Sequence, residues 1–189
     1  MKIAVFVSGS GTNLQNILDL IQNKTLDGIS VSCIVADRVC LGMERGLEFD
    51  IPTFLIERDK DLCLNIDQIL DPNIDYIVLA GFLSILTEDF CRKWEGKIIN
   101  IHPSLLPKYG GKGMWGHHVH QAVLDNQETI SGATVHFVTS QIDQGEVIVQ
   151  KSFAIESGYT IKDLQAKVQK VEFEIYPQAL KILLDKRAK

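Results

Sequence analysis

The sequence has few cysteines, no long apolar run and no excess of positive charge. No two of its four cysteines form a C-x-x-C pair, so we predict neither a disulfide framework nor a structural zinc site. No apolar stretch approaches the roughly 20 residues that a membrane span needs, and Met1 and Lys2 lead into a strand pattern without a signal-peptide profile. We therefore expect a soluble, cytoplasmic protein that binds no membrane. Its thiols are expected to be buried: Cys33, Cys40, Cys63 and Cys91.

The charge balance is acidic, with 19 Lys and Arg against 24 Asp and Glu and a formal net charge of −5. A nucleic-acid backbone needs a basic face, so we expect no nucleic-acid partner. The 189 residues are 46% hydrophobic, which suits one globular domain with a sizeable core. Because no repeat, low-complexity stretch or linker interrupts the chain, we predict a single domain over residues 1–189, acting as a monomer or homodimer.

The first half of the chain alternates between strand and helix patterns. Lys2 to Val7 is a short apolar run, glycines break it, and Asn13 to Ile21 has helical periodicity. Further strands are expected at Ser30–Ala36, Thr53–Ile56, Tyr76–Ala80 and Lys97–Ile101, and helices at Cys40–Phe49, Leu62–Leu70 and Thr87–Trp94. Several of these strands are apolar throughout, so the pattern predicts an α/β fold: an open, mostly parallel, Rossmann-like sheet with helices on both faces.

The pattern changes after Ile101. Two prolines and the glycine-rich segment 110–116 exclude regular structure until a helix near His118–Asp125. A long loop inside a compact domain is usually functional. The remaining expected elements are strands at Gly132–Val138 and Glu146–Phe153 and a helix over Ile161–Leu184, which Thr160 and Asp163 begin with a capping box.

The loop Ser8–Asn13 (SGSGTN) joins the first strand to the first helix. Glycines there allow close backbone approach, and free N–H groups at a helix start attract a phosphate. Leu14 replaces the third glycine of the dinucleotide fingerprint and no P-loop lysine follows, so neither NAD nor ATP is supported. A tight turn that needs glycine for its geometry alone is the alternative. Asp37, at the end of the second strand, stands where a dinucleotide-binding fold has its ribose-binding acid. The simpler interpretation of Asp37 is an acidic loop residue.

Asn100 and His102 stand at i and i+2 at the carboxyl end of an expected buried strand, so both side chains point to one face. Ligands of open α/β sheets bind at that end. An amide and an imidazolium are donors suited to a developing oxyanion, as in acyl transfer to an amine. Asp143, in IDQG, is on its own more simply a turn residue.

Five segments, in this order and at compatible spacings, resemble the phosphoribosylglycinamide formyltransferases over essentially the whole chain. They are SGSGTN at Ser8–Asn13, AGFLSIL at Ala80–Leu86, NIHPSLLPKY at Asn100–Tyr109, GATVHFV at Gly132–Val138 and Asp143-x-Gly145. The resemblance implies a transferase that moves the formyl group of 10-formyltetrahydrofolate, its co-substrate, to the amine of 5-phosphoribosylglycinamide in purine biosynthesis.

The resemblance also implies roles for particular residues, without any metal. Asn100 would polarise the formyl oxygen, His102 would donate a proton to the tetrahedral intermediate, and Asp143 would favour protonated His102 and organise proton transfer. The substrate's phosphate would be held by Gly11, Thr12 and Asn13, assisted by Gln169 and Glu172, and the folate by Leu83, Ser84, Ile85, Leu86 and Asn100.

Two departures limit this transfer of roles. Many members of the family have Arg where this chain has Ser84, so contact with the folate tail is left to another cation, Arg58 or Lys60. The loop between Gly110 and His120 is longer and richer in histidine than the usual form; we interpret it as a substrate-covering loop with solvent-facing His117, His118 and His120 rather than a metal site. For Trp115 three interpretations stay open: it covers the pocket, it is an exposed aromatic of the loop, or it contacts another subunit.

Four alternatives remain. A formyltetrahydrofolate deformylase has the same Asn, His and Asp but normally an additional preceding domain, whereas this chain starts at the first strand. A methionyl-tRNA formyltransferase would need a further domain and a basic surface. The remaining two alternatives are a noncatalytic phosphate-binding module and an NAD-dependent oxidoreductase. A titration with 10-formyltetrahydrofolate, the ribonucleotide and NADH distinguishes these functions.

Overall fold

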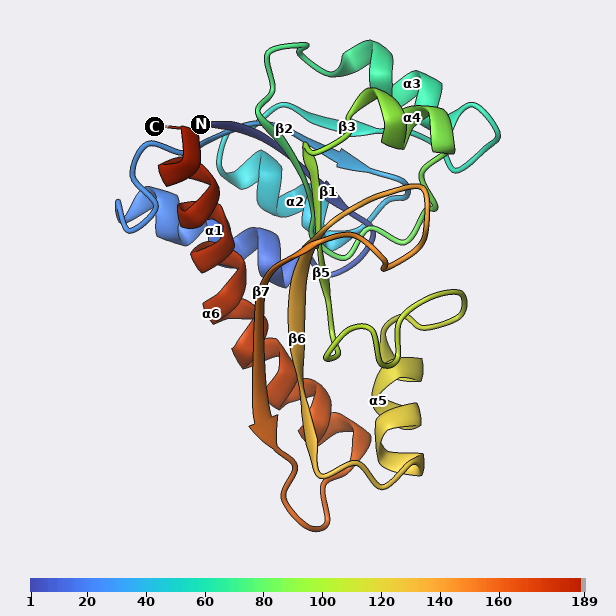
Figure 1. Cartoon of the computed structure of the whole chain (residues 1–189). Coiled ribbons are helices and arrows are strands. Elements are labelled where there is room, and N and C mark those ends of the chain that lie inside the picture. The colour runs from blue at the N-terminus through green and yellow to red at the C-terminus, as the bar shows by residue number, and fades with distance from the viewer. Residues whose placement is uncertain (188–189) are drawn as a thin grey trace.

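Short apolar runs, each followed by a helix or a loop, assemble into one seven-stranded sheet with the order β3-β2-β1-β4-β5-β6-β7 (Figure 1). The computed structural model describes residues 1–187. The first five strands are parallel, and the last two continue the sheet antiparallel. The strands are β1 (Lys2–Val7), β2 (Ser30–Ala36), β3 (Thr53–Leu55), β4 (Tyr76–Leu79), β5 (Ile98–His102), β6 (Ile130–Phe137) and β7 (Val147–Ala154). This confirms the expected open, mostly parallel sheet.

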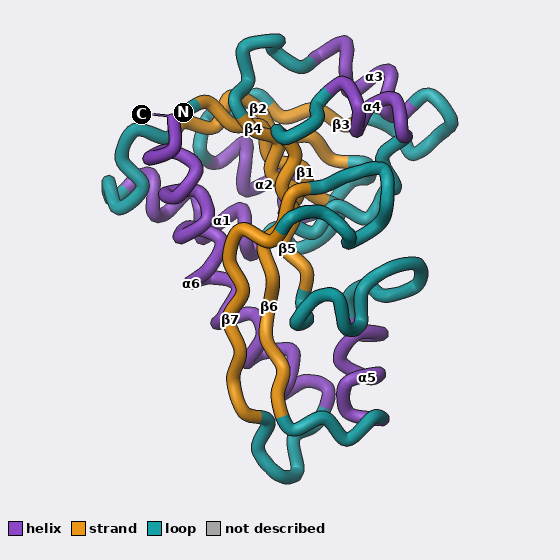
Figure 2. Tube along the Cα trace, in the orientation of Figure 1, coloured by secondary structure: helices purple, strands orange, loops and turns teal. Residues whose placement is uncertain are grey.

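Helices cover both faces of the sheet, as the strands that are apolar throughout predict (Figure 2). Along β1, Ile3, Val5 and Val7 pack into a core with α1 and α6. Ala4 and Phe6, which point the other way, pack with α3 and α4. The helices are α1 (Thr12–Gln22), α2 (Leu41–Glu48), α3 (Leu62–Ile69), α4 (Glu88–Lys93), α5 (His117–Asp125) and α6 (Ile161–Arg187).

The same alternation decides where β5 presents its polar side chains. Ile99 and Ile101 are buried in the core with α1 and α6. Asn100 and His102 therefore share the opposite face with Ile98, which packs with α3 and α4. The antiparallel register with β6 then sets His136 beside Asn100, so that polar side chains of two strands lie together.

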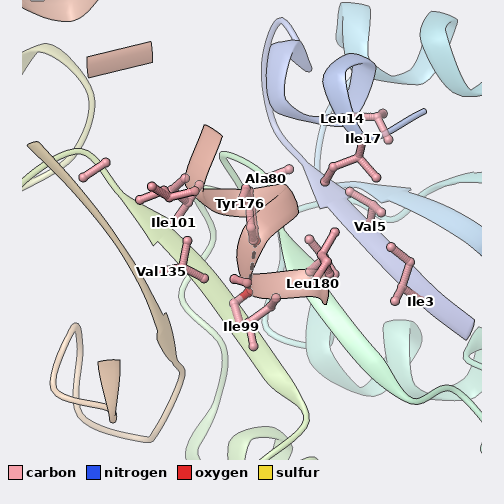
Figure 3. Close-up of a cluster of buried hydrophobic side chains, with 14 of the residues drawn as sticks. Ile3, Val5, Leu14, Ile17, Ala80, Ile99, Ile101, Val135, Tyr176 and Leu180 are labelled. Carbon is pink, nitrogen blue, oxygen red and sulfur yellow. Dashed lines mark hydrogen bonds between the residues drawn. The ribbon is translucent and has the colours of Figure 1, made fainter. Parts of the chain in front are cut away.

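The long helix α6 runs beside β6 and β7 and reaches into the centre of the core (Figure 1). Tyr176, fully buried, donates a hydrogen bond to the carbonyl of Leu79 at 2.9 Å. Its hydroxyl also lies 3.4 Å from the carbonyl oxygen of Ile99, the contact drawn in Figure 3. Pro177 lies inside the helix and cannot donate to the carbonyl of Phe173. Asn16 of α1 donates to that carbonyl instead, at 3.0 Å, which ties α1 to α6 and satisfies the helix at its proline.

Most of the expected boundaries agree with the structure to within one or two residues. The expected capping box of α6 is confirmed: Thr160 N donates to Asp163, and Asp163 N to Thr160 Oγ1 at 3.3 Å. The expectation that all cysteines are buried is wrong for Cys40, which is half-buried. None of the helices within residues 1–187 has the length and apolar character of a membrane span. The predicted domain also includes Ala188 and Lys189, which lie outside the described residues.

Candidate active site

The carboxyl ends of the parallel strands open into a cavity of about 760 Å³. Its lining comes from the loop after β1, the segment after β4, the end of β5, the loops 111–116 and 138–143, and α6. The volume lies within the usual range for small-molecule sites, and ligands of open α/β sheets bind at this edge. Every site residue predicted from the sequence lines this cavity: Gly11, Thr12, Asn13, Leu83, Ser84, Ile85, Leu86, Asn100, His102, Asp143, Gln169 and Glu172.

The glycine loop after β1 is shaped by its packing on α2. Gly11 has φ of 66°, and a Cβ there would lie 2.7 Å from the Cα of Gly42. The fold therefore requires glycine at this position whether or not a ligand approaches. At Gly9, in contrast, an added Cβ would meet nothing within 4 Å. The start of α1 has no side-chain cap, so its first N–H groups keep the partial positive charge that attracts anions.

Two side chains of α6 reach the start of α1. Gln169 Nε2 donates to Thr12 Oγ1 at 2.9 Å. Asn13 Nδ2 donates to Glu172 Oε2, also at 2.9 Å. Burial raises the pKa of the Glu172 carboxyl to about 7, and the Asn13 hydrogen bond opposes this only in part. The glycine loop and α6 thus form one polar wall of the cavity.

The amide of Asn100 is oriented by His136. The Nδ1 atom of His136 lies 2.8 Å from the carbonyl oxygen of Phe137, which can only accept, so Nδ1 carries the proton of the neutral ring. Nε2 is then an acceptor and receives a hydrogen bond from Asn100 Nδ2 at 3.2 Å. Burial lowers the pKa of His136, which keeps its ring neutral and preserves this acceptor.

A carbonyl oxygen also determines the tautomer of His102. His102 Nε2 lies 2.8 Å from the carbonyl of Tyr109, so Nε2 is the donor and Nδ1 is the atom that gains or loses a proton. That Nδ1 lies 3.6 Å from Asp143 Oδ2. The other carboxylate oxygen lies 3.7 Å from His136 Nε2. Both distances are too long for hydrogen bonds, but the charge of Asp143 acts on both rings.

Asp143 is held in place by the loop opposite. Its Oδ2 accepts a hydrogen bond from Gly111 N at 2.9 Å, and only 11% of its side chain is exposed. Its φ of 57° is the left-handed conformation of a turn residue, which agrees with the simpler sequence interpretation. The same turn aims the carboxylate at the two histidines.

The segment after β4 forms an apolar wall with one polar anchor. Leu83 and Ile85 are exposed at the cavity, with 42% and 72% of their surface accessible. Ser84 Oγ donates to Asp37 Oδ2 at 2.6 Å. The side chain of Asp37 is fully buried and forms ion pairs with Arg38 and Arg58. Asp37 is therefore closed to a ribose, and it lies in the loop directly after β2, in agreement with the simpler sequence interpretation of an acidic loop residue.

The histidine-rich loop differs from its prediction in one residue. His117 and His118 are exposed, as expected, and Trp115 packs edge-on against His118 with ring centroids 4.8 Å apart. His120 is only 3% exposed, so the expectation that it faces solvent is wrong. Burial, followed by the charge of His102, lowers the pKa of His120 to about 4, which makes it a neutral residue of the cavity wall. No cluster of metal-binding side chains is found within residues 1–187.

Sequence reasoning missed three contributors to the site. His136 appears in the sequence only as part of GATVHFV, and its contact with Asn100 depends on the antiparallel register of β5 and β6. Tyr109 acts through its main-chain oxygen, which no side-chain pattern reveals. Arg38 follows the end of β2, where the rule that ligands bind at carboxyl ends of strands would have indicated it.

A doubly wound sheet that groups an amide, imidazoles and a carboxylate around one cavity at its carboxyl edge defines an enzyme of the Rossmann-like class. The model of the family described as formyl transferase matches residues 1–180, and the chain belongs to that family.

Known proteins agree with this assignment in sequence and in structure. The chain is 35% identical over 96% of its length to the trifunctional purine biosynthetic protein adenosine-3 of Bos taurus, and 33% identical over 98% to the chloroplastic phosphoribosylglycinamide formyltransferase of Vigna unguiculata. It spans only 18% and 62% of those two proteins.

Among solved structures, phosphoribosylglycinamide formyltransferase from Anaplasma phagocytophilum superimposes with a TM-score of 0.90 at 30% identity, covering 98% of this chain and 88% of that one. The Bacillus halodurans protein of the same name gives a TM-score of 0.89 at 31% identity, covering 99% and 97%. These similarities extend over the whole sheet and the segments that line the cavity.

Proposed function

We propose that this chain transfers the formyl group of 10-formyltetrahydrofolate to the amine of 5-phosphoribosylglycinamide, a reaction of purine biosynthesis. One observation carries the proposal: Asn100, His102 and Asp143 meet at a single cavity that also contains an uncapped helix start suited to phosphate. Relatives and structural neighbours that carry the name phosphoribosylglycinamide formyltransferase add support.

The two substrates are assigned to different walls of the cavity. The phosphate of the acceptor binds at the N–H groups of Gly11, Thr12 and Asn13. Gln169 and Glu172 bind the polar groups next to it, because a carboxyl group is a better partner for hydroxyls than for a phosphate. The apolar wall at Leu83, Ser84, Ile85 and Leu86 takes the flat ring system of the donor, with Asn100 at the formyl end.

The chemistry follows from where the protons lie. The acceptor amine attacks the formyl carbon, and Asn100, with its amide oriented by His136, donates from its second N–H to the oxygen that gains charge. His102 supplies a proton from Nδ1, the nitrogen beside Asp143, as the new C–N bond forms and the bond to the folate nitrogen breaks. That nitrogen leaves protonated, and the proton released by the amine restores His102. No metal takes part in this scheme.

We further propose that the chain folds as one domain and acts in the cytoplasm as a monomer or homodimer. Its partners in this proposal are small molecules, without nucleic acid or membrane. Sedimentation of the purified chain and fractionation of cells test these two points.

The decisive experiment follows tetrahydrofolate release from 10-formyltetrahydrofolate with and without 5-phosphoribosylglycinamide. We expect release to depend on the acceptor and to match formation of the formylated ribonucleotide by mass spectrometry. Rapid release without the acceptor would assign a deformylase instead. Binding of both substrates without turnover would indicate a noncatalytic module, and a change in NADH fluorescence an oxidoreductase.

A further inference from the structure

The main chain of residues 109–111 contacts both members of the His102–Asp143 pair. The carbonyl of Tyr109 accepts a hydrogen bond from His102 Nε2 at 2.8 Å, and Gly111 N donates to Asp143 Oδ2 at 2.9 Å. One short segment therefore sets the tautomer of the imidazole and the place of the carboxylate beside it. Because both contacts come from main-chain groups, whatever fixes the conformation of this segment also fixes the pair.

Tyr109 has a backbone conformation that needs support. Its φ of 56° lies in the left-handed region, which is uncommon and costly for a bulky aromatic residue. A residue keeps such a conformation only where surrounding contacts determine it. In this conformation the carbonyl of Tyr109 faces His102, so the contacts that hold Tyr109 bear on the chemistry.

Glu128, in the connection between α5 and β6, supplies such contacts. Its Oε1 accepts hydrogen bonds from the hydroxyl of Tyr109 at 2.9 Å and from Lys108 Nζ at 2.8 Å. Its own N–H donates to the carbonyl of Val123 in α5 at 3.2 Å, so the anchor is itself tied to a helix. The side chain of Tyr109 is thus fixed at one end, while the main-chain carbonyl of the same residue binds His102 at the other.

The carboxylate of Glu128 is charged and stands apart from the substrates. Hydrogen bonds from Lys108 and Tyr109 lower its pKa, so both donors bind an ionised acceptor, which strengthens the contacts. Glu128 and Tyr109 line a separate cavity of about 90 Å³, and not the large cavity to which both substrates are assigned. An effect of Glu128 on the reaction must therefore pass through Tyr109.

We infer that Glu128 is a positioning residue for formyl transfer: through the hydroxyl of Tyr109 it holds the carbonyl that keeps the proton of His102 on Nε2. The inference rests on the proposed function, because it takes His102 to be the proton donor. It also has a consequence at the imidazole itself. Without the Tyr109 carbonyl, the charge of Asp143, 3.6 Å from Nδ1, favours the other tautomer, with the proton on Nδ1.

Steady-state kinetics test the effect on the reaction. Glu128→Ala should lower kcat roughly tenfold or more, the scale of a displaced catalytic group, while KM for both substrates changes by less than about twofold. Tyr109→Phe removes the same hydrogen bond from its other end and should have the same effect. Glu128→Gln keeps an oxygen that accepts from Tyr109 and should retain most of the turnover. The matched control is Thr129→Ala, an exposed neighbour, which should behave as the natural protein.

Nuclear magnetic resonance tests the position of the proton. Long-range proton–nitrogen correlations of protein with ¹⁵N-labelled histidine distinguish the two neutral tautomers, and His102→Ala assigns the His102 signals. At alkaline pH the natural protein and Glu128→Gln should have the His102 proton on Nε2. Glu128→Ala and Tyr109→Phe should show a population with the proton on Nδ1. A residue that only stabilises the fold would change the urea midpoint and leave the tautomer as it is.

The outcomes separate this inference from the proposed function. Natural turnover in Glu128→Ala, or a His102 tautomer that stays on Nε2 in either Glu128→Ala or Tyr109→Phe, overturns the positioning role and leaves the proposed function in place. A change of KM without a change of kcat also overturns it, because the residue would then act on binding. If the natural protein transfers no formyl group, the proposed function fails, and the tautomers still show whether Glu128 holds the Tyr109 carbonyl on His102.

Discussion

The carboxyl group of Glu172 makes the stability of this protein depend on pH in a direction that can be worked out. Its pKa is raised by burial from 4.5 to about 7 in the folded state. Between these values the folded chain holds a proton that the unfolded chain has released. The free energy of unfolding therefore falls as the pH rises from 5 to 7, and this effect is complete above pH 7. At about 1.4 kcal/mol per pH unit, the reduction is at most about 3 kcal/mol, because Glu172 keeps partial exposure to the cavity.

Glu172→Gln removes the ionisation and keeps an oxygen that accepts from Asn13. Urea unfolding at pH 5, 6, 7 and 8 should show nearly equal stability of the two proteins at pH 5 and an advantage for the variant of up to about 3 kcal/mol at pH 8. Glu174→Gln, exposed on the same helix, is the matched control and should change stability by less than about 0.5 kcal/mol at each pH. A constant difference between Glu172→Gln and the natural protein from pH 5 to 8 would refute the reasoning.

Other predictions concern the catalytic group and the glycine loop. In steady-state kinetics, Asn100→Ala or His102→Ala should lower turnover on the order of a hundredfold or more, with a smaller change in substrate affinity. Unchanged turnover in His102→Ala would exclude this site. Combining His102→Ala with Asp143→Asn should be little worse than the poorer single change, whereas multiplicative losses would show that the two residues act independently. Gly11→Ala should lower the free energy of unfolding by about 1 kcal/mol or more, and Gly9→Ala, where a Cβ meets nothing, should not; equal melting temperatures contradict this.

The sequence predicts the parallel part of the fold well because its signals are local. β1, β2, β4 and β5 consist mainly of apolar residues and are followed within two residues by glycine, proline or a polar residue, and such runs are typical of strands buried on both faces. The order of the strands in the sheet could not be predicted in this way. Which strand pairs with which depends on contacts between distant segments, and the antiparallel position of β6 beside β5 has no local signal.

The same difference between local and long-range signals explains which residues of the site could be predicted from the sequence. Asn100 and His102 were predictable because their spacing of two and their place after an apolar run are visible in the chain. His136 was not, since its role follows from the pairing of β6 with β5. Burial of His120 was in principle predictable, because it shares the apolar stripe of Val119 and Val123 on α5 at helical spacing.

Two main-chain carbonyls give the two histidines of the site opposite tautomers. The Tyr109 carbonyl holds the proton of His102 on Nε2, and the Phe137 carbonyl holds that of His136 on Nδ1. Asp143 therefore faces two unlike nitrogens: His102 Nδ1, which is free to take up a proton, and His136 Nε2, which already accepts from Asn100. A second proton on His136 would break the Asn100 hydrogen bond, and burial opposes it. Because of this arrangement, the nitrogen of His102 that faces Asp143 stays free for proton transfer, while the amide of Asn100 keeps its orientation.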